Sequence, residues 1–183
     1  MQTALPNISL RALQVTDWPL FLALHQDTAV QHFICDMQDE AQIRNQFDGS
    51  LLPWTVYSNH FMSEVILTAE QQAVGLIGLH SDWANRQVEV GFMLLPAAQG
   101  KGIAAAALQL MLTRAFSQYG YHKVTATVTD GNTASLRLLM RYGFVQEGLL
   151  RQNYWLAGQF VDDIRLGLLQ SDWLASQSPE LTD

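Results

Sequence analysis

The sequence contains one cysteine, no dense run of lysine or arginine, and no hydrophobic segment of membrane-spanning length. Cys35 alone can form neither an internal disulfide nor a cysteine metal cluster. Asp and Glu outnumber Lys and Arg by 17 to 10, giving a net charge of −7. A nucleic-acid surface must supply many cations, so DNA or RNA is disfavoured as the main partner. The charge suits a cationic substrate such as an amine or a basic protein.

Targeting signals are also lacking. The first 13 residues have no basic region followed by an apolar one, so we expect no signal peptide. The longest apolar stretch, Ile103–Leu112, is too short to span a bilayer, and a cytoplasmic protein is expected. The five histidines show no metal-ligand spacing, and we expect no metal.

What is present indicates one globular domain. The chain has 183 residues, 49% of them hydrophobic and 15% charged, with no repeat, linker or low-complexity segment. We expect a single domain over residues 1–183, with its core at about 8–170. Period-2 and period-3.6 patterns occur together, which predicts the α+β class. Alternation predicts strands at 8–13, 63–68, 73–80, 87–95, 123–128, from 143 onward, 149–156 and 160–168.

Helix signals lie between these strands. The sequence predicts a helix capped by Thr16, a second at Asp39–Phe47 closed by Gly49, and a third at Thr133–Arg141. A fourth helix follows a glycine loop and ends near residue 119. Short polar connections predict antiparallel pairing of the strands at 63–68, 73–80 and 87–95. The strands at 88–95 and 123–128 are joined through a helix, so parallel pairing is expected.

The glycine loop is the centre of this organisation. An apolar strand, Val88–Leu95, is followed by Gly100-Lys101-Gly102 and then by an alanine-rich helix. The first N–H groups of a helix have no internal partner and carry partial positive charge. Glycines let these amides approach a ligand without a Cβ in the way. The sequence therefore predicts an anion site suited to a phosphate or a pyrophosphate.

Several known loops have related patterns. A Walker A loop needs Ser or Thr after Lys101, and Gly102 stands there instead. Gly100-x-Gly102-x-x-Ala105 matches a dinucleotide fingerprint, with Asp130 as its ribose carboxylate, but residues 96–99 separate the strand from the glycines. A plain structural turn is a further alternative. The pattern Gln99-x-x-Gly102-x-Ala104 resembles the acetyl-CoA loop of the GNAT family of N-acetyltransferases.

A second group of motifs strengthens this resemblance. Asn132-Thr133-Ala134-Ser135 and then Arg141-Tyr142-Gly143-Phe144 resemble GNAT motifs in order and spacing. The late segment is similar to the branch that acetylates the N-termini of ribosomal proteins, through Glu147-Gly148, Asn153-Tyr154, Gly158 and Asp162-Asp163. The resemblance covers nearly the whole chain.

The resemblance implies a central, mostly antiparallel mixed sheet, splayed at its parallel strand pair and flanked by helices. Acetyl-CoA would enter the splay and bond the strand backbone at Phe92, Met93 and Leu94. Its pyrophosphate would bind the amides from Gly100 to Ala104, with Asn132 positioning the cofactor. The implied cofactor residues are Phe92, Met93, Leu94, Gln99, Gly100, Lys101, Gly102, Ile103, Ala104 and Asn132. The alternative for Lys101 is a solvent-exposed side chain without a ligand.

Acetyl transfer to an amine needs a base for the ammonium proton and a donor for the leaving thiolate. Glu89 is the candidate base because it alternates with its apolar neighbours beside the expected thioester channel; the alternative is a solvent-exposed sheet face. Ser135 is the candidate donor by resemblance; the alternative is a first-turn serine bonded to the backbone. Many GNAT enzymes have a tyrosine acid where this chain has Leu139.

The acceptor is the least determined part of the prediction. The late segment favours the N-terminal α-amine of a ribosomal or other cytoplasmic protein, acetylated by direct attack in a ternary complex. A polyamine or an aminoglycoside is the alternative, with acidic residues that could line its pocket: Asp36, Asp39, Glu40, Asp162 and Asp163. A catalytically silent acyl-CoA-binding module is a third hypothesis, and an oligomer is possible.

Overall fold

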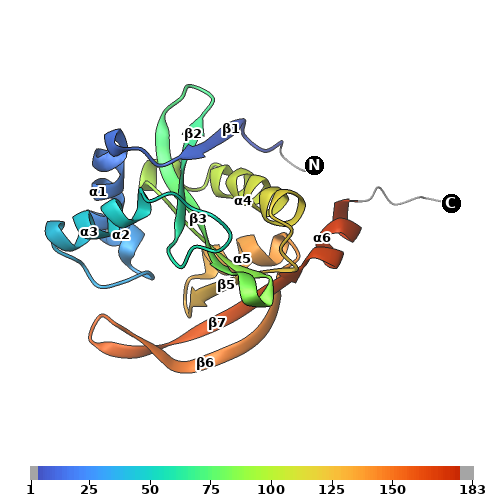
Figure 1. Ribbon diagram of the computed structural model, residues 1–183. Helices are drawn as coiled ribbons and strands as arrows, with labels where there is room; N and C mark the ends of the chain where they lie inside the picture. Colours follow the sequence, from blue (N-terminus) through green and yellow to red (C-terminus); the bar gives the residue numbers. More distant parts are fainter. Residues whose placement is uncertain (1–3, 178–183) are drawn as a thin grey trace.

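The computed structural model describes residues 4–177, and a seven-stranded sheet forms its centre (Figure 1). The strands lie in the order β1-β2-β3-β4-β5-β7-β6, and only β4 and β5 are parallel. The predicted α+β fold with one parallel pair is therefore confirmed. The strands are β1 (Ile8–Ala12), β2 (Met62–Thr68), β3 (Ala73–Asp82), β4 (Gln87–Leu94), β5 (Lys123–Thr129), β6 (Val145–Leu156) and β7 (Gln159–Leu169).

Helices cover both faces of the sheet and bury a separate apolar cluster on each (Figure 1). One face packs against α4, α5 and α6, with Leu108, Leu139 and Trp173 among the buried side chains. The other packs against α1 and α3 through Phe21, Leu24 and Phe47. The helices are α1 (Trp18–Gln26), α2 (Thr28–Gln31), α3 (Glu40–Ser50), α4 (Ile103–Thr113), α5 (Thr133–Arg141) and α6 (Gln170–Gln177). None of the helices in the described part has the length and apolarity needed to span a bilayer.

The splay predicted between β4 and β5 follows directly from their register. The two strands pair only from Gln87 with Lys123 to Glu89 with Thr125, whereas β5 pairs with β7 along its whole length. Beyond Glu89 the strands separate, so that edge of β4 has no strand partner among residues 4–177. An extended ligand with amide groups can therefore pair with it.

The ends of several elements differ from prediction. Thr16 is not the N-cap of the first helix, because Val15–Asp17 form a 3-10 turn and α1 begins at Trp18. Asp17 instead accepts hydrogen bonds from Arg11 at 2.6 and 2.8 Å, and this bonding holds the pKa of its carboxyl below the usual value. Gly49 does not follow the second predicted helix but lies inside α3, since its neighbours maintain the helix to residue 50.

The helix after the glycine loop is also irregular at its end. After α4 the chain continues as a π-helical turn, Arg114–Gln118, where Arg114 forms an ion pair with Glu64 of β2. The predicted end near residue 119 is confirmed, since Gly120 follows with φ +71°, a left-handed conformation typical of helix ends. The last hairpin is longer than predicted, since β6 already begins at Val145. Its turn places Ala157 at φ +51° and Gly158 at φ +78°, as a two-residue hairpin turn requires.

Candidate active site

The glycine loop connects the end of β4 to α4. A 3-10 turn, Pro96–Ala98, brings the chain round, and Gly100 and Gly102 then take positive φ values of 71° and 78°. Gly102 is the N-cap of α4, so the predicted helix N-terminus begins at Ile103. Gln99 donates through Nε2 to the carbonyl of Leu94 at 3.0 Å. Its side chain therefore fastens the loop to β4.

A cavity of about 260 Å³ opens beside this loop. It brings together four of the predicted loop residues and places α5 on the opposite wall. Lys101 is exposed and does not line it. The lining residues are Leu94, Gly100, Gly102, Ile103, Ala104, Ala105, Ala134, Arg137, Leu138 and Arg141.

Sequence reasoning missed the two arginines in this wall. Arg137 and Arg141 are four residues apart on α5, so they lie on one face of the helix, next to the N-terminus of α4. Their spacing of four residues in the sequence was the signal that could have identified them as a pair on one helix face. Two guanidinium groups, glycine amides and a helix N-terminus together form a donor set that fits a diphosphate.

The three β4 residues predicted to bind the cofactor do not point in the same direction. Leu94 lines the cavity, whereas Phe92 packs against the α4-side core and Met93 against the α1-side core. This division follows from the alternation of side chains along β4. The backbone of all three residues lies on the part of β4 that is not paired with β5.

At the start of α5, Asn132 acts as the helix cap, and its Oδ1 accepts the N–H of Ser135 at 3.2 Å. Ser135 is half-buried, and its hydroxyl has no hydrogen-bond partner within residues 4–177. Leu139 lies one helical turn after Ser135, on the same face of α5, and is 1% exposed. The Tyr142 hydroxyl is already bonded, since it donates to the carbonyl of Ala105 at 2.7 Å, and burial raises the pKa of Tyr142.

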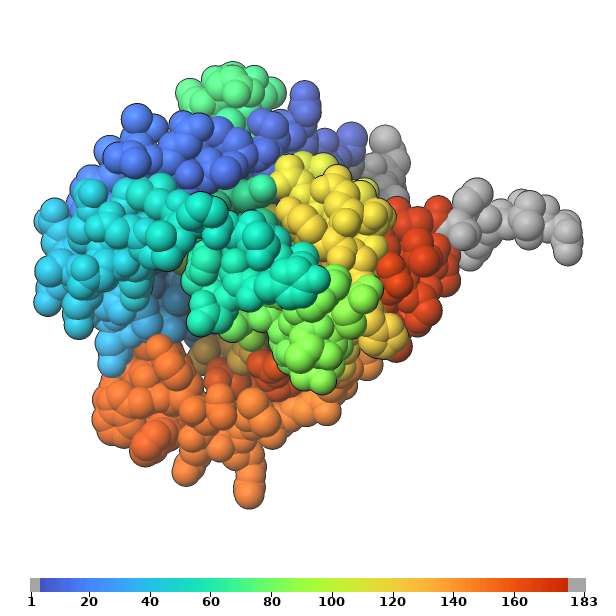
Figure 2. All heavy atoms as spheres, in the orientation of Figure 1, coloured from blue at the N-terminus to red at the C-terminus, as the bar shows by residue number. Residues whose placement is uncertain are grey.

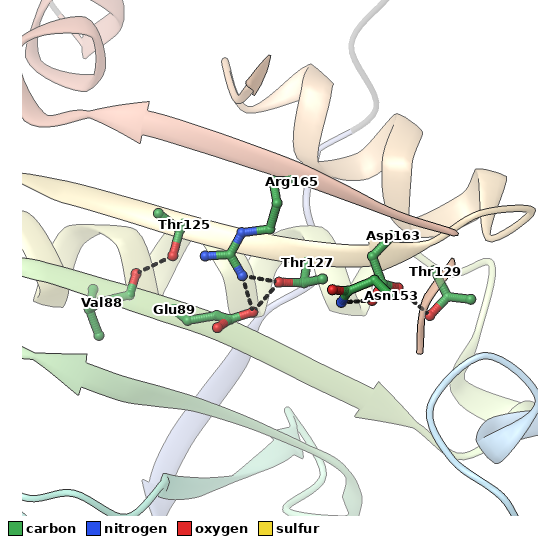
Figure 3. A network of polar contacts seen from close by, with 8 residues as sticks. All are labelled: Val88, Glu89, Thr125, Thr127, Thr129, Asn153, Asp163 and Arg165. Atoms are coloured by element: carbon green, nitrogen blue, oxygen red, sulfur yellow. Dashed lines mark hydrogen bonds and ion pairs between the residues drawn. The ribbon is translucent and has the colours of Figure 1, made fainter. Parts of the chain in front are cut away.

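Glu89 lies on the other face of the sheet, which also carries α1 and α3. Its Oε1 accepts a hydrogen bond from the Thr127 hydroxyl at 2.5 Å and lies 3.6 Å from Nη1 of Arg165 (Figure 3). Arg165 also donates to Thr127 at 2.5 Å. The Glu89 side chain is 36% exposed, so the carboxylate is both anchored and accessible. Neither partner was identified from the sequence.

Asp163 of β7 extends this polar group (Figure 3). It is 5% exposed and accepts hydrogen bonds from the Thr129 hydroxyl at 3.1 Å and from Asn153 at 2.8 Å. Close by, burial raises the pKa of Tyr154, and the negative charges of neighbouring acidic groups raise it further. Tyr154 therefore remains protonated near neutral pH.

The segment after α2 closes one side of this face. Asp36 accepts the backbone N–H of Ala157 at 2.7 Å, which joins the segment to the tip of the β6–β7 hairpin. The ring of Phe33 lies against Gly131, where an added Cβ would be 3.3 Å from it. Figure 2 shows the surface hollowed between the orange hairpin and the cyan-to-teal segments. A second molecule has a route of approach here, on the opposite face from the α4–α5 cavity.

Within residues 4–177, no three His, Cys, Asp or Glu side chains are grouped so that they could hold a metal ion. Of the acidic residues expected near an acceptor, Asp36 and Asp163 lie near Tyr154. Asp39 caps α3, with Glu40 in its first turn. Asp162 accepts the backbone N–H of Gln152 at 2.7 Å.

The sequence was compared with models of known protein families to decide which family has these features. Residues 7–145 match the model of the acetyltransferase (GNAT) domain. The chain belongs to the GNAT family of acetyltransferases. The dinucleotide-binding and plain-turn interpretations of the glycine loop are therefore set aside.

Relatives of this GNAT chain differ in the acceptors that their names give. A putative ribosomal N-acetyltransferase of Bacillus subtilis, YdaF, is 33% identical over 100 residues, which are 54% of this chain and 55% of that protein. The spermidine N(1)-acetyltransferase of Escherichia coli K12 is 26% identical over 174 residues, covering 92% and 89%. The chain thus aligns with about half the length of the first relative.

Solved structures show the same fold. The structure of spermidine N-acetyltransferase from Vibrio cholerae in complex with CoA and spermine superposes with a TM-score of 0.80. It covers 91% of this chain and 98% of that one at 24% identity. The splayed sheet and the α4 loop are therefore features of a GNAT fold.

Proposed function

We propose that this chain transfers the acetyl group of acetyl-CoA to a primary amine, by direct attack in a ternary complex. The observation that supports this most strongly is the position of the splay. It separates an anion-binding loop on one face of the sheet from an anchored, accessible carboxylate on the other. A long phosphorylated donor and an amine can thus reach one point from opposite faces.

On the donor side, the amides from Gly100 to Ala104 and the guanidinium groups of Arg137 and Arg141 would hold the pyrophosphate. The unpaired edge of β4 at residues 92–94 would bond the pantetheine amides. Acetyl-CoA supplies an acyl group activated as a thioester. The protein residues bind it, orient it and provide hydrogen-bond donors.

On the acceptor side, Glu89 would take a proton from the ammonium group, because only a neutral amine is a nucleophile. Ser135 would donate to the leaving sulfur, and its hydroxyl lacks an intramolecular partner in the described chain. Leu139 is buried and apolar, so it cannot provide the acid that many GNAT enzymes obtain from tyrosine.

The preferred acceptor is an N-terminal α-amine. The candidate base is a carboxylate that is already paired with a cation, since Arg165 lies 3.6 Å from Glu89. An α-amine deprotonates about 2.5 pH units below a lysine amine, an advantage of about 3.4 kcal/mol at neutral pH. A weak base is therefore enough for an α-amine. Arg165 also places a positive charge where a polycation would have to approach.

A polyamine is the second candidate, and one observation favours it. Asp163 and Asp36 both lie near the Tyr154 hydroxyl, so the acceptor face contains carboxylates that can bind additional ammonium groups. The relatives named as spermidine acetyltransferases point in the same direction. Peptide and polyamine acceptors must therefore be compared directly.

The test is release of CoA thiol from acetyl-CoA, measured with peptides that have a free N-terminus, with spermidine and spermine, and with aminoglycosides. Mass spectrometry then locates the acetyl group. We expect it on the α-amine of a peptide, with internal lysines unmodified. Turnover with spermidine alone would assign the polyamine function. Binding of acetyl-CoA without turnover of any amine would identify a silent binding module.

A further inference from the structure

The contact between Glu89, Thr127 and Arg165 joins three strands at the point where the splay begins (Figure 3). Thr127 and Arg165 lie opposite each other in the β5–β7 register, so both side chains project from the same face. Glu89 comes from β4 and is the last residue that pairs with β5. Thr127 thus contacts β4 across the widening gap.

The direction of these hydrogen bonds is fixed by the chemistry of the groups. A guanidinium group only donates, so Arg165 donates to the Thr127 oxygen. The hydroxyl has one proton, which it donates to Oε1 of Glu89. The second carboxylate oxygen, Oε2, has no hydrogen-bond partner among residues 4–177.

This arrangement compensates for the missing backbone pairing. Beyond Glu89 the ladder between β4 and β5 ends, so backbone hydrogen bonds no longer fix one strand relative to the other. A threonine side chain is restricted at χ1, so it is a stiff connection. Arg165 holds the hydroxyl from the other side. Both contacts restrain the rotation of the carboxylate.

We propose that Thr127 and Arg165 are positioning residues for acetyl transfer: they hold Oε1 of Glu89 so that Oε2 accepts the proton of the acceptor ammonium. This inference rests on the proposed function. The N–H bond breaks as the proton moves to Oε2, and the freed lone pair forms the bond to the acetyl carbon. The carbon–sulfur bond breaks with its electrons on sulfur. In balance, an ammonium ion and a thioester give an amide, a thiol and one proton.

Other ionisable groups lie on the same face as Glu89, and their influence on turnover must be distinguished from that of Glu89. His80 of β3 lies directly opposite it on the same sheet face. Lys123 of β5 forms an ion pair at 2.6 Å with Glu147 of β6, and Asp163 lies further along β7. The His80→Gln variant is therefore measured in parallel as a control.

The test compares Thr127→Val, which is nearly isosteric but lacks the hydroxyl, with Thr127→Ser, which keeps it. Thr125→Val is the matched control, because it removes a hydroxyl, on the same strand and face, that hydrogen-bonds to no other side chain among residues 4–177. Turnover is measured across pH 6–9 with the best acceptor, beside acetyl-CoA affinity and melting temperature. We expect Thr127→Val to lower kcat by about ten- to a hundredfold, as a misplaced base does. Thr127→Ser should remain within about threefold of the parent.

Arg165 is tested by comparing kcat with acetyl-CoA affinity. Arg165→Met removes the donor to the Thr127 hydroxyl, so kcat should fall while acetyl-CoA affinity stays the same. Arg165→Lys, which keeps a cationic donor, should stay closer to the parent. Neither Thr125→Val nor His80→Gln should lower kcat.

The outcomes separate the inference from the function on which it rests. If the parent acetylates an amine and Glu89→Gln is slow, but Thr127→Val keeps normal turnover and pH profile, the positioning role is wrong and the function stands. The positioning role would also be overturned if Thr127→Val lost acetyl-CoA affinity or melting temperature as much as turnover, while its pH profile stayed the same as that of the parent. If the parent acetylates no amine, the proposed function fails.

Discussion

The donor side and the acceptor side of the candidate active site are built in opposite ways. The donor side uses backbone amides, two glycines and a helix N-terminus, all within a few consecutive residues of the β4–α4 connection. The acceptor side uses the side chains of Glu89, Thr127 and Arg165, which come from three strands. One backbone geometry can therefore serve every donor that carries the same phosphate groups, whereas the side chains can be substituted to suit different acceptors.

The relatives are named as N-acetyltransferases, but their names give different acceptors. In the proposed function, changing the loop would affect binding of every CoA thioester, because the amides themselves would bind the ligand. Changing a side chain on the other face alters only proton transfer or acceptor fit. Variants on the two sides should separate into effects on donor affinity and effects on turnover.

The largest expected effect is on the acceptor side. Glu89→Gln should lower kcat by about a hundredfold or more, the contribution of a general base, while acetyl-CoA affinity stays the same. The defect should be greatest at low pH, where more of the acceptor is protonated, and should shrink above the pKa of the amine. Steady-state rates from pH 6 to 9 measure this. Equal rates for variant and parent would remove Glu89 from the mechanism.

On the donor side, Gly102→Asp should weaken acetyl-CoA binding by about thirty- to a hundredfold. Gly102 has φ +78°, and an added Cβ would lie 3.2 Å from Cδ of Pro6, so strain adds to charge repulsion at the helix N-terminus. Gly102→Asn is the control, because asparagine has nearly the same shape and tolerates positive φ. Calorimetry should show that Asn loses much less affinity than Asp. Unchanged affinity in Gly102→Asp would refute the loop assignment.

A smaller effect is expected where the two sides meet. Ser135→Ala should lower kcat by about tenfold and leave acetyl-CoA affinity nearly unchanged, since a bond to the leaving sulfur strengthens only in the transition state. Asn132 keeps its capping role in this variant. A loss of affinity with normal turnover would make Ser135 a structural residue.

The smallest effects concern the α5 arginines. Arg137→Gln and Arg141→Gln should each weaken acetyl-CoA binding by about two- to fivefold, because exposed charges are screened by solvent and salt. The loss should be greatest at low ionic strength. Arg44→Gln, on an exposed face of α3, is the control. If all three variants bind alike, the arginines do not contact the phosphates.

The fold and the conformation of the glycine loop could be predicted because both are encoded locally. Alternation in β4, glycines at positive φ and the Asn132 cap are each readable within a few residues. The polar group around Glu89 could not be predicted in the same way. Thr127 and Arg165 are 38 residues apart and meet only through the β5–β7 register, which no local pattern defines. Thr16 was misassigned for a similar reason, since Arg11 lies outside the helix whose start it affects.

The hydrogen bond from Ala157 to Asp36 joins two segments that are 121 residues apart in the sequence. It fastens the segment that follows α2 to the tip of the β6–β7 hairpin. Each segment therefore restrains the other, so a substitution that removes the Asp36 carboxylate would release both at once.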